Sequence, residues 1–312
     1  MAIIKNPENP IVEALEGLHL FHYDGAPCAQ RVRFALGEKG LVRGREERFD
    51  DGRPSACVAE SGAWVSRTVS LPKKEHMSPA YAGIHANLVV PALVHDGVLH
   101  VESVDIIEYL DEAFGGDLLV PRQDAARYAE VEMLTSLAEV LHRSIRFVTF
   151  RWGLGSLGKL NAKEEAQLRG LVQQGGDGEK LVEFYEGYDS GTITDAVYFA
   201  HLGELADGFT EIESRLADGR LFLSGDTVTV ADALWAMKVM RLDECGYPFT
   251  ELYPQVSEWF QRVSQRASFR TGVMGHHHIW HRVFKTKAAV ESALGIGLKK
   301  VVLASQPRRI VS

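Results

Sequence analysis

Cys28 is the side chain whose type and position point most directly to nucleophilic chemistry. It follows Pro27 in PCAQRVRFALGEKG, whose apolar residues recur at helical spacing. Pro27 suits a first helical turn and Gly40 the position just past the end, so a helix is predicted over 27–39. Free N–H groups in a first turn favour a thiolate, whereas a small buried apolar role for Cys28 is the simpler alternative. The sequence leaves both open.

A second group of residues could hold a peptide ligand. A cis bond before Pro91 would turn the backbone N–H and C=O of Val90 outward, toward an extended peptide. Glu102 and Ser103 would start a helix over 104–114, where free N–H groups and a hydroxyl suit a carboxylate and an acidic side chain suits an ammonium. A purely structural cis-proline and a plain serine cap are the alternatives.

The elements that would position these residues come in the order strand, helix, strand, then strand, strand, helix. LHLFHY after Gly17 and the weaker GREERF at 44–49 read as strands. Two apolar runs flank Asp96-Gly97, a dipeptide that favours a tight hairpin turn. The stretch 51–83 has no clear period, so we expect an insertion with one short helix.

The remainder is helical in pattern. Thr229 and Asp232 have the spacing of a capping box before a buried helix, and 153–193 reads as a long connection. Further helices are predicted over 124–152, 162–173, 195–217 and 254–267. The sequence therefore predicts an α/β part followed by an all-helical part.

Composition narrows the function classes. The chain has 312 residues, 46% of them hydrophobic and 24% charged, with a net charge of −8; this is typical of a globular protein of two domains. The chain has three cysteines and no CxxC pair, which favours a reducing cytoplasm. The N-terminal residues lack a basic start followed by an apolar stretch, so no export is expected. No apolar run approaches the roughly 18 residues of a membrane helix, so no membrane partner is expected.

Charge is unevenly distributed along the chain. Residues 271–312 contain seven Lys or Arg and one acid, Glu291, so they carry +6 and the remainder −14. An acidic body argues against a nucleic acid as the partner, because nucleic-acid binders display basic faces. We expect the basic extension to pack on the acidic body or to hang free.

With these pieces together, the chain resembles the cytosolic glutathione transferase superfamily over residues 17–270. The resemblance rests on LHLFHYDGAPCAQRVRFALGEKGL, VVPALVHDGVLHVESVDIIEYLDE and LFLSGDTVTVADALW. It implies a thioredoxin-like glutathione-binding domain over 17–116 and an all-helical substrate domain over 122–270, between extensions at 1–16 and 271–312. It also implies that Val90, Pro91, Glu102 and Ser103 contact glutathione, with no metal.

Two departures from the superfamily pattern bear on activity. HANLVVP replaces the usual NPxGxVP lead-in, so His85, Ala86 and Leu88 occupy the Asn, Pro and Gly positions. Ala26 occupies the position, five residues before Arg31, that holds a thiol-activating serine or cysteine in many classes. Thiol activation would then rest on Cys28, on Tyr23, or on the backbone N–H groups of 25–28.

The resemblance implies an enzyme that attacks a bulky, aromatic electrophile with glutathione thiolate, possible reactions being β-aryl ether cleavage and dehalogenation. It would act as a dimer of identical or related chains. A non-catalytic subunit of a heterodimer, favoured by Ala26, and a Cys28-dependent thiol transfer enzyme are the competing interpretations.

Two further clusters allow alternative interpretations. Arginines and aromatic residues alternate near the end of the predicted long helix: Arg143, Arg146 and Arg151, with Phe147, Phe150 and Trp152. The arginines and rings together could line an electrophile pocket. Alternatively, the arginines form an exposed basic face, and the aromatic rings form a stripe that packs into the core. His276, His277, His278 and His281 have the residue type of a metal site, but no acidic or cysteine neighbour in sequence, so no metal role is expected.

Overall fold

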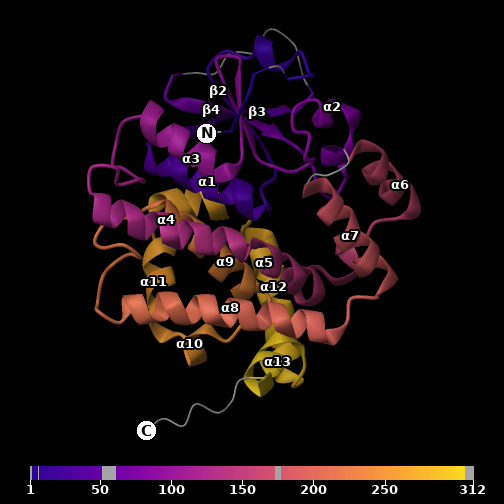
Figure 1. Cartoon of the computed structure of the whole chain (residues 1–312), viewed down its shortest axis with the longest axis vertical. Helices are drawn as coiled ribbons and strands as arrows, with labels where there is room; N and C mark the ends of the chain where they lie inside the picture. The colour runs from indigo at the N-terminus through magenta and orange to yellow at the C-terminus, as the bar shows by residue number, and fades with distance from the viewer. Residues whose placement is uncertain (1, 6, 51–60, 173–176, 306–312) are drawn as a thin grey trace. The chain divides into compact units, whose positions relative to one another are not determined.

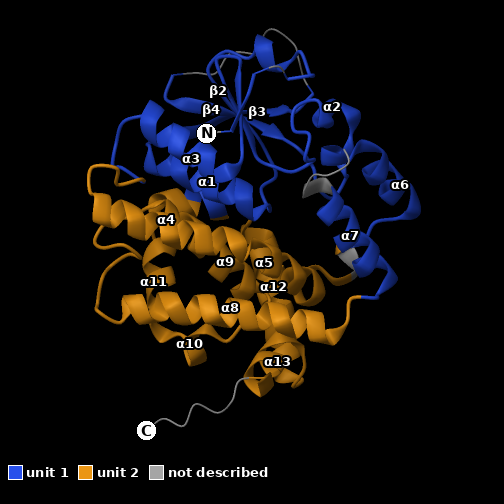
Figure 2. Cartoon of the chain, viewed as in Figure 1, with its two compact units in different colours: residues 1–119, 159–192, 271–273 blue, residues 120–158, 193–270, 274–312 orange. Residues whose placement is uncertain are grey.

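The protein, seen here as a computed structural model, is described over residues 2–5, 7–50, 61–172 and 177–305 (Figure 1). It divides into two compact units (Figure 2). Unit 1 comprises 1–119, 159–192 and 271–273, and unit 2 comprises 120–158, 193–270 and 274–312. The segment 159–192, read from the sequence as a connection within the helical domain, thus belongs to unit 1.

Unit 1 is built on a mixed sheet with the strand order β1-β6-β5-β2-β4-β3. Strand β2 runs parallel to β4 and antiparallel to β5, while β6 pairs antiparallel with both β5 and β1. The strands are β1 Ala2–Ile4, β2 Leu18–His22, β3 Val42–Arg48, β4 Ala63–Thr68, β5 Ala92–His95 and β6 Val98–Val101. The predicted hairpin is confirmed, with Asp96 and Gly97 both at positive φ as such a turn requires.

Two strands differ from the sequence-based expectation. Strand β4 lies between β2 and β3, inside the stretch 51–83 that was expected to be an insertion with one short helix. Its sequence, AWVSRT, hides this because Ser66 and Arg67 are buried polar residues where a central strand is normally apolar. Strand β1, from the expected N-terminal extension, adds to the sheet beside β6. Residues 51–60 lie outside the described part of the chain.

Helices α1 (Pro27–Glu38) and α3 (Ser103–Ala113) pack against each other in unit 1. A buried ion pair, with Lys39 Nζ 2.5 Å from Asp111 Oδ1, joins the C-terminal end of α1 to α3. The described residues of unit 1 also form α2 (Pro79–Ala82), α6 (Ala162–Leu171) and α7 (Asp177–Ser190). Helix α6 was predicted, and α2 lies in the stretch 51–83 where one short helix was expected. Helix α7 was not predicted, because the glycine-rich run before it conceals that helix.

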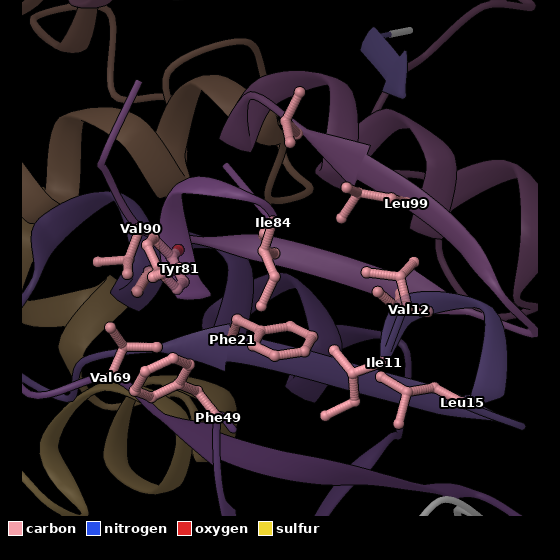
Figure 3. Packing of buried hydrophobic residues seen from close by; sticks show 14 of the residues in the cluster. Ile11, Val12, Leu15, Phe21, Phe49, Val69, Tyr81, Ile84, Val90 and Leu99 are labelled. Carbon is pink, nitrogen blue, oxygen red and sulfur yellow. The ribbon is translucent and has the colours of Figure 1, made fainter. Parts of the chain in front are cut away.

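An apolar cluster in unit 1 supports the segment that leads to Pro91 (Figure 3). Phe21 of β2 packs there with Tyr81 of α2 and with Ile84, all of them buried. Tyr81 Oη donates a hydrogen bond of 2.8 Å to the carbonyl oxygen of Val89. The core thereby fixes the backbone immediately before the Val90–Pro91 bond.

Unit 2 is helical. The predicted helix 124–152 is instead three consecutive pieces: α4 (Ala125–Val140), α5 (His142–Val148) and a π-helical turn (Thr149–Leu154). The other helices are α8 (Asp195–Leu216), α9 (Val230–Glu244), α10 (Phe249–Leu252), α11 (Pro254–Ser264), α12 (His278–Ala293) and α13 (Gly297–Ser305). A second π-helical turn spans Phe269–Met274, and its Thr271–Val273 part belongs to unit 1.

The predicted capping box at α9 is confirmed, and it does more than cap the helix. Asp232 accepts hydrogen bonds from the N–H and hydroxyl of Thr229 at 2.8 and 2.9 Å. The same carboxylate accepts from the Leu223 N–H and from Trp259 Nε1 at 3.0 and 2.9 Å. The Asp232 carboxyl group therefore ties α9 to α11 and to the loop before α9, and its four hydrogen bonds satisfy a polar side chain in the core.

The segment before Pro91 contains two buried histidines, His76 and His85. Burial lowers the pKa of each imidazole to about 4, with a further contribution from Lys74 at His76. Both rings are therefore neutral in the folded protein near pH 7.

These two pKa values predict that the protein loses stability in mild acid. In the unfolded chain a histidine takes up a proton below about pH 6.5, whereas His76 and His85 stay neutral until about pH 4. Each of the two histidines should lower the free energy of unfolding by about 3 kcal/mol as the pH falls from about 6.5 to about 4. Urea unfolding across this range should show a smaller loss for His85→Asn. The exposed His276→Asn should match the wild type, and an equal loss in all three proteins would contradict the assignment.

Candidate functional site

The candidate site gathers at one end of the sheet in unit 1. Ala92 of β5 pairs with Phe21 of β2, and Leu93 pairs with His100 of β6. Strands β2 and β6 therefore end at the edge where β5 begins. This register brings the segments that follow β2 and β6 next to Val90 and Pro91, although they are far apart in sequence.

The Val90–Pro91 peptide bond is cis, as the sequence pattern suggested. Val90 lies just before the β2–β5 ladder, whose last described pair is Phe21 with Ala92. Its side chain is buried in the core cluster, so the residue is anchored from inside the unit (Figure 3). Leu88, in the position where the superfamily pattern has glycine, adopts a positive φ of 56°. The departure HANLVVP thus keeps the turn conformation that glycine usually supplies.

Glu102 and Ser103 form the entry to α3. Glu102 is exposed, with φ of 61° and ψ of 114°, a conformation that is uncommon for a residue with a side chain. Such conformations cluster at ligand sites, where the surrounding structure enforces them. Ser103 is buried and is the first residue of α3, so the expected serine cap is not formed: Glu102 is the capping position.

Instead of capping the helix, the Ser103 hydroxyl accepts hydrogen bonds from Arg31 of α1. Its Nε donates to Ser103 Oγ at 2.8 Å and its Nη2 contacts the same oxygen. Nη2 also donates to the Sγ of Cys28 at 3.6 Å. A buried guanidinium thus connects the first turns of α1 and α3, where both helix dipoles already favour negative charge. In the sequence, Arg31 marks only the register of the RVR stretch; its place on the same helix face as Cys28, three residues on, is the signal that points to this contact.

Cys28 is the second residue of α1 and is partly exposed, while Ala26, the capping residue, is buried in the core cluster. The Ala26 methyl group cannot form a hydrogen bond, so the residue at the usual activating position cannot activate a thiol. A partly exposed sulfur beside a guanidinium and helix N–H groups favours the interpretation of Cys28 as a nucleophile over that of a buried apolar residue. Cys57, the third cysteine, lies outside the described residues.

Tyr23 belongs to the turn between β2 and α1. Its carbonyl oxygen accepts from the Ala26 N–H at 3.1 Å, which closes the turn, and from Arg33 at 3.3 Å. Its ring packs so closely on Gly25 that a Cβ there would lie 2.9 Å from Tyr23 Cε1. Glycine is therefore required for the ring to lie beside the α1 N-terminus. Tyr23, Ala26 and Cys28 are thus neighbours around one turn.

The arginine and aromatic cluster lies in unit 2. Arg151 packs over Trp152 and Tyr198, 4.9 and 4.3 Å from the ring centres, and pairs with Asp195 at 2.6 Å. Phe147 and Trp152 are buried, whereas Arg143 is exposed. This arrangement matches the interpretation of a basic outer face over an aromatic core stripe.

The histidine segment has an acidic companion that its sequence neighbours did not reveal. Glu244 of α9 is buried, and its Oε1 lies 2.7 Å from His277 Nε2 and 3.0 Å from His281 Nδ1. Arg241 donates to its other oxygen at 2.9 Å. Although burial opposes it, Arg241 and the imidazoles hold the pKa of Glu244 well below its ordinary value. With both oxygens in use, this is an ion-pair network, and the described residues contain no group arranged to hold a metal.

Comparison with known proteins agrees with this architecture. Residues 20–117 match the glutathione S-transferase N-terminal domain, and 195–262 match the glutathione S-transferase C-terminal domain. Human ganglioside-induced differentiation-associated protein 1-like 1 is 27% identical over 305 residues, covering 84% of this chain and 75% of that protein. The probable maleylacetoacetate isomerase of Vibrio cholerae is 25% identical over 168 residues, covering 53% of this chain and 68% of the isomerase.

Solved structures show the same fold. The β-etherase LigF from Sphingobium sp. strain SYK-6 superposes with a TM-score of 0.66 at 19% identity, covering 82% of this chain and 98% of LigF. Human glutathione S-transferase T1-1 superposes with a TM-score of 0.58 at 19% identity, covering 92% and 99%. With both domain types matched in the expected order, the chain belongs to the cytosolic glutathione transferase superfamily, with a thioredoxin-like N-terminal domain and a helical C-terminal domain.

Proposed function

We propose that this protein binds glutathione at the α1 and α3 N-termini of unit 1 and directs its thiolate at a bulky aromatic electrophile. The observation that carries the proposal is the Arg31 side chain, which contacts both Ser103 Oγ and Cys28 Sγ. It places a buried positive charge between two helix N-termini, an arrangement suited to an anionic ligand.

The charges of the site match those of glutathione. Its γ-glutamyl carboxylate would sit at the α3 N-terminus, where Ser103 and Arg31 provide donors, and its ammonium group beside the carboxylate of Glu102. The peptide groups of the cysteinyl residue would pair with the backbone of Val90. Binding then holds the thiol near the turn that contains Tyr23 and Cys28.

Thiol activation would come from groups other than residue 26. The helix N–H groups of 25–28, the Arg31 guanidinium and the Tyr23 hydroxyl are the positive or donating groups of this turn. The glutathione sulfur would attack an electrophilic carbon, forming a carbon–sulfur bond as a carbon–oxygen or carbon–halogen bond breaks. The proton lost by the thiol would balance the phenolate or halide that leaves.

For the electrophile we favour an aryl ether or an organic halide. The fold likeness to a β-etherase is compatible with this choice but does not carry it at 19% identity. We expect a dimer, of identical or related chains, in a reducing cytoplasm that keeps Cys28 a free thiol. The purified chain with glutathione should release phenol from a β-aryl ether or halide from a haloaromatic, and release of neither would reject this substrate class.

Glutathione binding should depend on Glu102. Isothermal titration of the full chain should give a dissociation constant that rises about tenfold in Glu102→Gln, equivalent to about 1.4 kcal/mol. The matched control is Glu112→Gln, which removes one exposed carboxylate from the same helix and should leave the constant unchanged. If the two variants bind equally well, Glu102 does not contact the ligand. If the wild type does not bind at all, the non-catalytic subunit becomes the better interpretation, as Ala26 would favour.

Cys28 should be the reactive thiol of the described residues, and bound ligand should shield it. Cys245 provides the internal control, because burial raises its pKa to about 12. Iodoacetamide should modify Cys28 much faster than Cys245, as followed by peptide mass spectrometry, and Arg31→Met should slow the modification of Cys28. S-methylglutathione, which has no free thiol, should protect Cys28; unchanged labelling in its presence would place the ligand elsewhere.

The contact between Arg31 and Cys28 also supports a second candidate, a glutathione-dependent thiol transfer enzyme. In that reaction the Cys28 thiolate would attack a glutathione mixed disulfide and release the partner thiol, leaving Cys28 bound to glutathione. Cys28→Ala separates the two candidates: it would abolish thiol transfer, whereas a transferase relying on Tyr23 and the turn backbone would keep its activity.

A further inference from the structure

Helix α12 exposes its apolar side. Ile279, Val283, Val290 and Leu294 are all at least half exposed, with Ile279 at 65% and Leu294 at 69%. At 100° per residue these four positions fall within about 60° of one another on the helix surface. They form one stripe along the helix that ends at the C-cap residue Leu294, and Trp280, 46% exposed, lies at the edge of the stripe. We call this set of five residues the α12 stripe.

The opposite side of α12 faces α9 and is polar. Lys285 Nζ pairs with Asp243 Oδ1 at 2.7 Å, and His281 Nδ1 lies 3.0 Å from Glu244 Oε1. Ala288 packs on Gly246: a Cβ atom added at Gly246 would lie 3.1 Å from the Cβ of Ala288. The helix is thus reversed with respect to an ordinary surface helix: ion pairs hold it to the unit, and its apolar residues point away from them.

Neighbouring α13 shows the ordinary arrangement, which makes the reversal in α12 specific. Leu298 and Val302 of α13 are buried, and Lys299 pairs with Glu251 at its outer side. By contrast, α12 buries none of its described residues. A contiguous apolar surface that a folded unit could have buried, but does not, marks a contact with another phase or molecule.

Charge identifies the partner. Arg282 flanks the α12 stripe on one side, and residues 271–312 carry +6 in an otherwise acidic chain. Lys287, on the other side, pairs with Glu291 Oε1 at 2.7 Å and donates to the Trp152 carbonyl oxygen at 2.6 Å. A second copy meeting through the same face would bring two such basic segments together, since an isologous interface places each patch against itself. An anionic lipid surface complements both features: acyl chains take the apolar stripe, and headgroup phosphates take the flanking cations.

We propose that the α12 stripe is a docking surface for anionic phospholipid membranes, which helix α12 contacts while lying in the interface. Within the described residues, no helix combines the length and the hydropathy needed to cross a bilayer, so the contact is peripheral. This proposal replaces the expectation of no membrane partner that was drawn from the sequence. It is independent of the glutathione site, which lies in unit 1.

The test is co-sedimentation of the full chain with vesicles of phosphatidylcholine alone or mixed with an equal amount of phosphatidylserine. The protein should sediment with the mixed vesicles only, and added salt should weaken the binding. The variant Ile279→Glu/Val283→Glu should reduce the bound fraction about tenfold, since each charge would have to enter the interface. Val42→Glu/Val140→Glu adds the same charge at exposed valines elsewhere and should reduce binding much less.

Trp280 gives a readout local to the stripe. It is the exposed tryptophan of the chain, because Trp64, Trp152, Trp235 and Trp259 are all buried. Brominated lipids in the mixed vesicles should quench the fluorescence of the wild type, and most of this quenching should disappear in Trp280→Phe. Equal sedimentation of the two double variants would overturn the proposal. So would an oligomer, seen by light scattering, that only Ile279→Glu/Val283→Glu disrupts while neither vesicle binds.

Discussion

The candidate site depends on the hydrogen bonds that the buried Arg31 guanidinium makes with Ser103 and Cys28. Removing an arginine from water costs free energy, and the contacts of Arg31 with Ser103 and Cys28 contribute to offsetting that cost. Because α1 and α3 pack side by side, the charge is held between two helix N-termini that also favour anions. The proposed anionic ligand would meet donors there that are already desolvated and oriented, so its binding would require little further ordering.

Further contacts of α1 hold the turn beside the candidate site. Arg33, two residues along α1, donates to the carbonyl oxygens of Tyr23 and Asp24 from below the turn. Gly25 allows the Tyr23 ring to lie directly on the backbone. Arg31 and Arg33 thus have different tasks: one presents charge to the site, and the other fixes the loop that carries the candidate activating groups. A sequence pattern that reads RVR as one motif does not separate them.

Local patterns predicted the elements whose signals are complete within a few residues. The hairpin at Asp96-Gly97, helix α1 and the capping box at Thr229 each depend on contacts between near neighbours. Strand β4 was missed because its neighbours in the sheet, not its own composition, make it a strand, and its buried Arg67 is satisfied by His19 and by the Arg48 carbonyl oxygen. Tertiary context overrides strand propensity in such cases.

The residues of the candidate site show the same difference between local sequence signals and contacts that only the folded chain makes. The superfamily pattern assigns Glu102, Ser103 and Pro91 to the candidate site, but the Arg31–Ser103 contact joins positions 72 residues apart, and spacing alone cannot show it. The Glu244 carboxylate between His277 and His281 joins α9 to the start of α12 in the same way. That network also fixes the orientation of α12, because the helix must turn its histidine and lysine side toward α9. The exposure of its apolar side follows from this electrostatic anchoring rather than from any excess of apolar residues.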